Sequence, residues 1–122
     1  MRDQNDLEMA KELFDEGLTL AQSQTDKSLV SVFFSNLGIT SLRAHEFNRA
    51  IDYANSALAI RRELDLQPLT TADLATLAAA YLAVEFPERA LDYARQAQSI
   101  LDELDGEGPD SPQRDYFVCY SF

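Results

Sequence analysis

Residues 74–105 read LATLAAAYLAVEFPERALDYARQAQSILDELD, and residues 34–65 read FSNLGITSLRAHEFNRAIDYANSALAIRRELD. Aligned with Leu74 over Phe34, the two stretches are identical at 12 of 32 positions. The identities include the run from Asp52 to Ala54, which returns as Asp92 to Ala94. The shift between the two stretches is 40 residues, and a fixed period of this length is typical of stacked supersecondary units. The sequence therefore predicts a repeat architecture.

The same offset reaches the N-terminal part of the chain. A second shift by the same period aligns Ala10, Gly17 and Leu20 with Ala50, Ala57 and Ile60. The first segment therefore corresponds to the second half of an earlier unit. We predict one domain over residues 1–105, divided into a half repeat at 3–24 and repeats at 27–66 and 71–105.

The apolar residues within each unit recur at helical spacing. Leu74, Leu77 and Tyr81 share one face of a helix, and the segment that follows Pro87 shows the same spacing. Turn and cap signals separate these segments, with Gln67-Pro68 expected to end one helix, Thr70 or Thr71 to cap the next, and Pro87 to open another. The predicted fold class is all-α, with helices near residues 3–24, 27–44, 47–66, 71–84 and 87–105.

These positions resemble the tetratricopeptide repeat, a helical repeat with small residues and aromatics at set places. The matching residues are Leu74, Leu77, Ala78, Tyr81, Ala90, Tyr93 and Ala97, and before them Phe34, Leu37, Gly38, Phe47, Ala50, Tyr53 and Ala57. Ser41 departs from the pattern, which usually has Tyr there, and the period is longer than the family's, which is about 34 residues. The resemblance implies antiparallel helix-turn-helix repeats stacked as a short right-handed superhelical array.

In such arrays the first helices of the units line a concave groove. The residues that the resemblance assigns to this groove are Ser35, Asn36, Ile39, Leu42, Arg43, Ala75, Thr76, Ala79 and Leu82. Family members that grip a partner's C-terminal carboxylate use Lys and Asn, whereas Ser35 and Ile39 stand at those positions here. An amphipathic helix or an apolar extended peptide suits this groove better. A neighbouring repeat or a second copy could equally cover it.

The sequence changes character after residue 105. Residues 106–114 are rich in Gly and Pro and are predicted to be a linker. Residues 115–122, DYFVCYSF, are aromatic and β-prone, and they resemble the opening strand of Toll/interleukin-1 receptor domains. That resemblance implies a fragment of a larger protein. The alternative is an apolar tail that folds back or pairs between copies through Tyr116, Phe117, Val118 and Tyr120.

Charge and hydropathy restrict the partners. The formal net charge is −11, which repels nucleic acid phosphates and anionic lipids, so neither is an expected partner. No apolar run reaches the length of about 18 residues that a membrane span needs. The N-terminus lacks the features of a secretory signal, and a single cysteine cannot form an internal disulfide. An acidic cytoplasmic protein is the expectation.

The sequence offers little that points to catalysis. His45 is the only histidine, and Cys119, the only cysteine, has no histidine near it in the sequence. Gly-rich phosphate loops are absent, so no catalytic residue, metal or cofactor is predicted. The expected function is a scaffold that binds a protein or peptide or self-associates. The alternative is the regulatory arm of a signalling or NAD-cleaving protein whose catalytic domain is absent from this chain.

Overall fold

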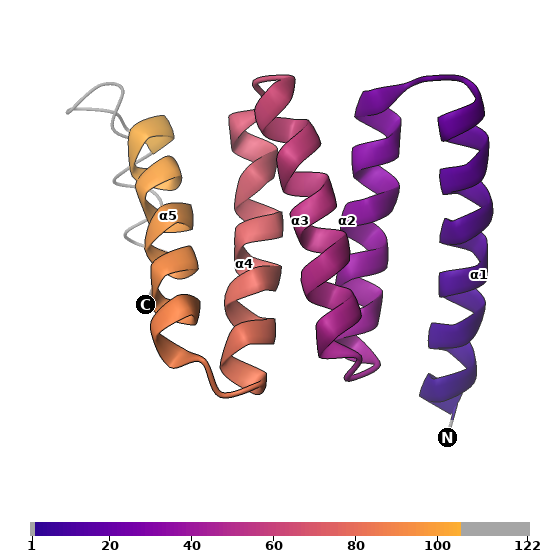
Figure 1. Cartoon of the computed structure of the whole chain (residues 1–122), viewed down its shortest axis with the longest axis horizontal. Helices are drawn as coiled ribbons and strands as arrows, with labels where there is room; N and C mark the ends of the chain where they lie inside the picture. The colour runs from indigo at the N-terminus through magenta and orange to yellow at the C-terminus, as the bar shows by residue number, and fades with distance from the viewer. Residues whose placement is uncertain (1, 106–122) are drawn as a thin grey trace.

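The computed structural model of the chain describes residues 2–105, which form five α-helices in a row (Figure 1). Their bounds are α1 Arg2–Ser23, α2 Lys27–Arg43, α3 Phe47–Glu63, α4 Gln67–Ala83 and α5 Pro87–Asp105. Each helix packs against its neighbours in sequence, and α2 also contacts α4. The predicted fold class, an all-α array of stacked helix pairs, is confirmed. The predicted linker at 106–114 and the segment 115–122 lie outside the described residues.

The helices are separated by four similar turns, and α2, α3, α4 and α5 begin at the evenly spaced positions 27, 47, 67 and 87. In each turn the residue after the helix cap has a positive φ, with values of 52° at Thr25, 63° at His45, 58° at Asp65 and 68° at Glu85. In the second turn the Glu46 N–H donates to the Ser41 carbonyl at 2.8 Å, and the His45 N–H donates to the Leu42 carbonyl at 3.0 Å. This is the Schellman closure of a helix end.

Two of the predicted helix bounds are wrong. The helix predicted over 47–66 ends at Glu63, and the helix predicted over 71–84 begins at Gln67. Pro68 lies in the first turn of α4, where backbone N–H groups have no partner within the helix, so a residue that lacks an N–H is tolerated there. Pro68 therefore belongs to the start of α4 and not to the end of α3. The hydroxyls of Thr70 and Thr71 donate to carbonyls at positions 67 and 68 inside that first turn, so neither residue is the N-cap.

Small residues at the helix contacts bring the backbones close together. Ala50, Ala54 and Ala57 on α3 are all buried, and a Cβ on Gly38 of α2 would lie 3.4 Å from the Ala54 nitrogen. Larger side chains fill the space between α3, α4 and α5, where Leu74 and Leu77 are fully buried. The rings of Tyr81 and Tyr93 stack there, with centroids 5.5 Å apart. The core is therefore a continuous seam along the row of helices.

Candidate interaction surfaces

The predicted groove residues differ in exposure and fall into three groups, namely buried, partly buried and exposed. Ser35 and Thr76 are buried at 7% and 6% exposure, so their side chains are not presented to a ligand. Three residues of α2, namely Asn36, Ile39 and Leu42, are partly buried. The exposed members are Arg43, Ala75, Ala79 and Leu82. Only part of the predicted set therefore lies on an accessible surface.

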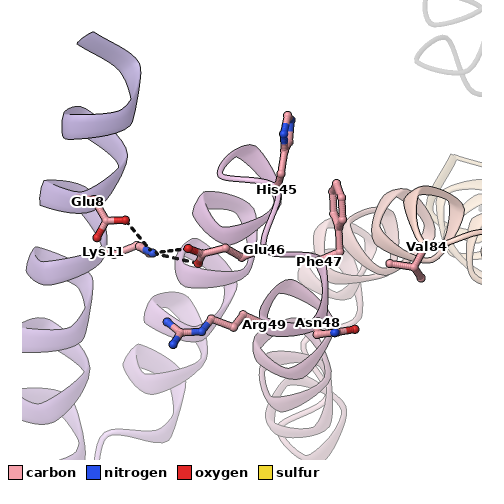
Figure 2. Close-up of a pocket in the computed structure, with 8 residues that line it drawn as sticks. All are labelled: Glu8, Lys11, His45, Glu46, Phe47, Asn48, Arg49 and Val84. Atoms are coloured by element: carbon pink, nitrogen blue, oxygen red, sulfur yellow. Dashed lines mark hydrogen bonds and ion pairs between the residues drawn. The ribbon is translucent and has the colours of Figure 1, made fainter. Parts of the chain in front are cut away.

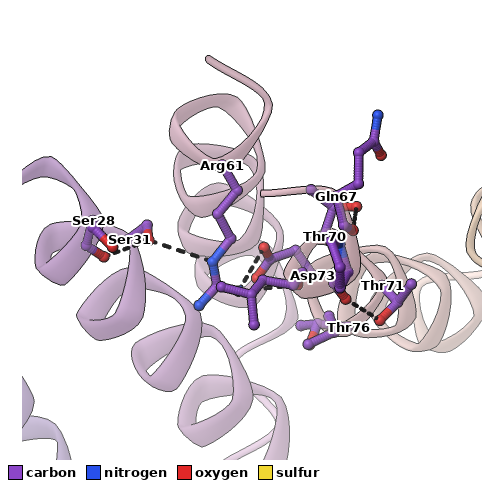
Figure 3. Close-up of polar contacts among 11 residues, drawn as sticks. Ser28, Ser31, Arg61, Gln67, Thr70, Thr71, Asp73 and Thr76 are labelled. Carbon is purple, nitrogen blue, oxygen red and sulfur yellow. Dashed lines mark hydrogen bonds and ion pairs between the residues drawn. The ribbon is translucent and has the colours of Figure 1, made fainter. Parts of the chain in front are cut away.

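A buried ion pair and its hydrogen bonds join α2, α3 and α4 (Figure 3). Arg61 of α3 donates from Nη1 to Asp73 Oδ2 of α4 at 3.0 Å, and from Nε to Ser31 Oγ of α2 at 3.3 Å. The same Nη1 donates to the Leu69 carbonyl at 3.2 Å. Both charged side chains are almost completely buried, at 6% and 1% exposure. Arg61 therefore holds α4 against α2 and α3.

The environment of Asp73 opposes its ionisation. Burial raises the pKa of this carboxyl, and the nearby charge of Arg61 with its hydrogen bond to Oδ2 offsets only part of that rise. A buried carboxyl with a raised pKa is sometimes a general base. Here the Asp73 side chain is 1% exposed and paired with Arg61, so a substrate cannot reach it. The pair is a structural element of the array.

The exposed face of α4 is apolar from Pro68 to the end of the helix. Its members are Pro68, Ala72, Ala75, Ala79, Leu82 and Ala83, all exposed. The helix has one charged residue, Asp73, and that side chain is buried. A helix that is apolar all round is normally covered on every side. Among the described residues nothing covers this face of α4.

A hollow of about 460 Å³ adjoins that face, between α4 and α5. Its lining is entirely apolar and consists mainly of alanine, with Ala78, Ala79, Leu82, Pro87, Ala90, Leu91 and Ala94. Leu82 and Leu91 on its rim are 62% and 51% exposed. The hollow and the apolar face share Ala79 and Leu82. Together they form a continuous apolar surface at the α5 end of the row.

A second depression, of about 590 Å³, is polar and lies where α1 meets the turn between α2 and α3 (Figure 2). Lys11 Nζ lies 2.9 and 3.0 Å from the two carboxylate oxygens of Glu46 and 3.3 Å from Glu8. The hydrogen bond to Glu46 raises the pKa of Lys11, although its burial acts in the opposite direction. Arg49 also lines the depression, so the two carboxylates are balanced by two basic side chains and the depression is not a strongly charged site.

His45 is positioned by the turn and not by a catalytic constellation. Its ring stacks on Phe47, with centroids 5.7 Å apart, and it is exposed. Figure 2 shows His45 projecting away from the contact between Lys11 and Glu46. Within residues 6–104, whose side chains the structure describes, no three His, Cys, Asp or Glu residues are grouped as a metal site would require. The same residues contain no helix with the length and apolarity of a membrane span.

Two features of these surfaces were not predicted from the sequence. The pair of Arg61 and Asp73 breaks the repeat, since Leu101 stands one period after Arg61 and Phe33 stands one period before Asp73. A single charge in the otherwise uncharged sequence of α4 was the available signal. The hollow follows from the exposed Leu91 and Ala94, whose burial depends on whether another element follows in the stack.

Comparison with known proteins adds no relative. The chain matches no protein-family model, no curated protein and no solved structure. The functional argument therefore rests on the geometry of the surfaces described above.

Proposed function

We propose that this protein is an interaction module that binds an apolar protein segment on the exposed face of α4. The observation that carries the proposal is the absence of any charged side chain on that face, which runs from Pro68 to Ala83. Large contiguous apolar patches that are exposed on a folded protein often mark interaction sites. The likeness of the repeat to tetratricopeptide arrays supports the same function by analogy.

The chemistry of this face selects the kind of ligand. Ala72, Ala75 and Ala79 are small, so a partner backbone can approach α4 closely. A carboxylate clamp needs several donors on this surface. Among the predicted groove residues Arg43 is the one exposed basic residue and Asn36 is half-buried, so such a clamp is not favoured. We expect the apolar stripe of an amphipathic helix, or alternate side chains of an extended peptide, to bind here.

The other predicted roles depend on the last eight residues. A regulatory arm for a receptor-type domain is suggested by residues 115–122 alone, which lie outside the described residues. A non-enzymatic function remains part of the proposal, because the described surfaces bring no nucleophile and base together. The apolar face therefore supports a binding module better than any other role.

The test is selection of binders from a random peptide library displayed on phage, followed by affinity measurement with synthetic peptides by fluorescence anisotropy. Selected peptides should carry apolar residues at helical or alternating spacing. Ala75→Glu should weaken their binding at least about tenfold, because the complex would bury an unpaired charge. Ala75 is exposed, so this substitution leaves the fold intact, which circular dichroism would verify.

Leu13→Glu is the matched control, since Leu13 is 60% exposed on α1 at the other end of the row. Peptide affinity should be unchanged by Leu13→Glu. The proposal is contradicted if the selection yields no binder. It is also contradicted if the selected peptides bind equally well to Ala75→Glu and Ala72→Glu, because the apolar face of α4 is then not the site.

A further inference from the structure

The hollow between α4 and α5 is the place that a helix fills one unit earlier. On α3, the side chains of Ile51, Ala54 and Leu58 pack with residues of α4, and the last two are 1% and 4% exposed. The residues one period later on α5 are Leu91, Ala94 and Gln98, and all three are exposed. The α4–α5 pair therefore repeats a surface that elsewhere receives the next segment of the chain.

The next segment of the chain is in register to enter this place. The turn after α3 at Asp65 leads directly into α4, and Asp105 stands at the position of Asp65 one unit later. Residues 107–122 then align with residues 67–82 of α4. Pro109 and Pro112 disfavour a helix like α4 in the first half of this stretch. Its apolar residues are concentrated in the second half, at 116–120 and 122.

We infer that residues 115–122 of this chain bind in the hollow between α4 and α5. The hollow is lined by Ala78, Ala79, Ala90 and Ala94, and such small residues leave room for large side chains. The segment supplies Tyr116, Phe117, Tyr120 and Phe122, which are the side chains that bury the most apolar area. The two partners are thus complementary in size and in polarity.

The chain is long enough to make this contact. The hollow reaches Ala94 on α5, and the helix from Ala94 to Asp105 is about 16 Å long at ~1.5 Å per residue. The nine residues 106–114 span up to about 30 Å when extended, so residue 115 can reach the hollow. A returning chain would also pass Leu101, which is 47% exposed on α5.

Two other occupants are less well supported. A second copy of the chain carries the same net charge of −11, so association of two copies works against electrostatic repulsion. A separate partner must compete with a segment that is tethered beside the hollow, at an effective concentration of the order of millimolar. Because the hollow and the apolar face share Ala79 and Leu82, the tethered segment would restrict access to that face. This last consequence rests on the proposed function, whereas the contact itself does not.

Cys119 provides the test, since it is the only cysteine and lies inside the segment. The rate of alkylation of Cys119 by iodoacetamide should be at least about tenfold lower in the native chain of residues 1–122 than in the same chain unfolded in urea. Ala94→Glu and Leu91→Glu should raise the native rate several-fold, because each places a charge in the hollow. Leu13→Glu, at the α1 end of the row, should leave the rate unchanged.

The other outcomes overturn the inference. A native rate equal to the unfolded rate means that the segment is not bound. Slow alkylation that is insensitive to both hollow substitutions means that residues 115–122 are buried somewhere other than the hollow. Protection that disappears on dilution identifies a second copy as the occupant. Since no peptide ligand is used, failure here leaves the proposed function of the α4 face to its own test.

A disulfide provides a second, independent measurement. The variant Ala94→Cys should form an intramolecular bond with Cys119 under mild oxidation, which mass spectrometry would detect in a monomer. Arg49→Cys, on an exposed position of α3, is the matched control and should not form it. Equal yields for the two variants would contradict specific binding in the hollow.

Discussion

The α2–α3 pair and the α4–α5 pair have related sequences and the same turn, yet their corresponding residues differ in burial. Ala54 is 1% exposed and Ala94 is exposed, although both lie in the same DYA sequence. The difference arises because α4 covers α3, whereas no described element covers α5 on the side away from α4. In a stacked array the stability of each position therefore depends on its neighbours as well as on its own sequence.

The largest effect is expected where α4 is anchored on α2 and α3. Asp73→Ala should destabilise the fold by about 3–5 kcal/mol, because it leaves the Arg61 guanidinium buried without its counterion. Leu101→Ala, on α5 at the position that matches Arg61, should cost much less since Leu101 is 47% exposed. Urea unfolding monitored by circular dichroism measures both. A cost below about 1 kcal/mol for Asp73→Ala would contradict an anchoring role.

The same pair predicts a pH dependence. The folded state raises the pKa of Asp73 above its unfolded value, so the stability linked to this carboxyl is present below the unfolded pKa and is lost as the pH rises through the folded pKa. In the double variant Arg61→Met with Asp73→Leu this loss is absent. Its stability relative to the wild type should therefore increase as the pH rises from the ordinary carboxyl pKa of 3.8 through the raised pKa of Asp73. A pH-independent difference between the two proteins would argue against this titration.

The contrast between covered and uncovered alanines can be tested by overpacking. Ala54→Leu should cost about 1–3 kcal/mol, because α4 leaves no room for a larger side chain beside α3. Ala94→Leu should cost at least about 1 kcal/mol less, because Ala94 is exposed at the hollow. Thermal and urea unfolding of the two variants provide the comparison. Equal costs would mean that the two faces are equally covered in solution.

The repeat period was enough to predict helix pairs, their order and the equivalence of their faces. It did not predict the start of α4, because Pro68 can either end one helix or open the next, and only the even spacing of the helix starts decides. Nor did it predict the burial of Ser35 and Thr76. Those two were assigned to the groove by analogy, whereas the structure buries both side chains.

Contacts between units were the least predictable. The turns recur because each is closed by local backbone hydrogen bonds, which the repeat preserves. The anchoring pair is specific to one junction, since Ala21 and Phe33 occupy the matching positions at the junction of α1 and α2. A Cβ at Gly17 of α1 would overlap the Phe33 ring, so that junction is packed by size and not by charge. Sequence periodicity detects what is repeated and misses such substitutions.

A smaller effect, in the stabilising direction, is expected at the turns shared by both pairs. His45→Gly and Glu85→Gly should each stabilise the protein by about 0.5–1 kcal/mol, because glycine adopts a positive φ without the strain of a Cβ. Ala44→Gly is the control, since Ala44 has a φ of −82° and gains nothing from glycine. Loss of stability in both turn variants would show that their side chains matter more than the backbone strain.

The smallest effect is expected at the ion pair between α1 and the following turn. Lys11 and Glu46 form an ion pair at positions where the next unit has the apolar residues Ile51 and Phe86. Glu46→Gln should cost less than about 1 kcal/mol at neutral pH, and less still in about 1 M salt, because the Glu46 side chain is 34% exposed. The raised pKa of Lys11 means that this contribution is present below its ordinary value of 10.5 and is lost as the pH rises through the folded pKa. Glu63→Gln breaks the ion pair between Lys27 and Glu63, whose two side chains are 62% and 57% exposed respectively. This substitution should cost even less. A reversed order of the two costs would show that exposure does not decide the strength of these pairs.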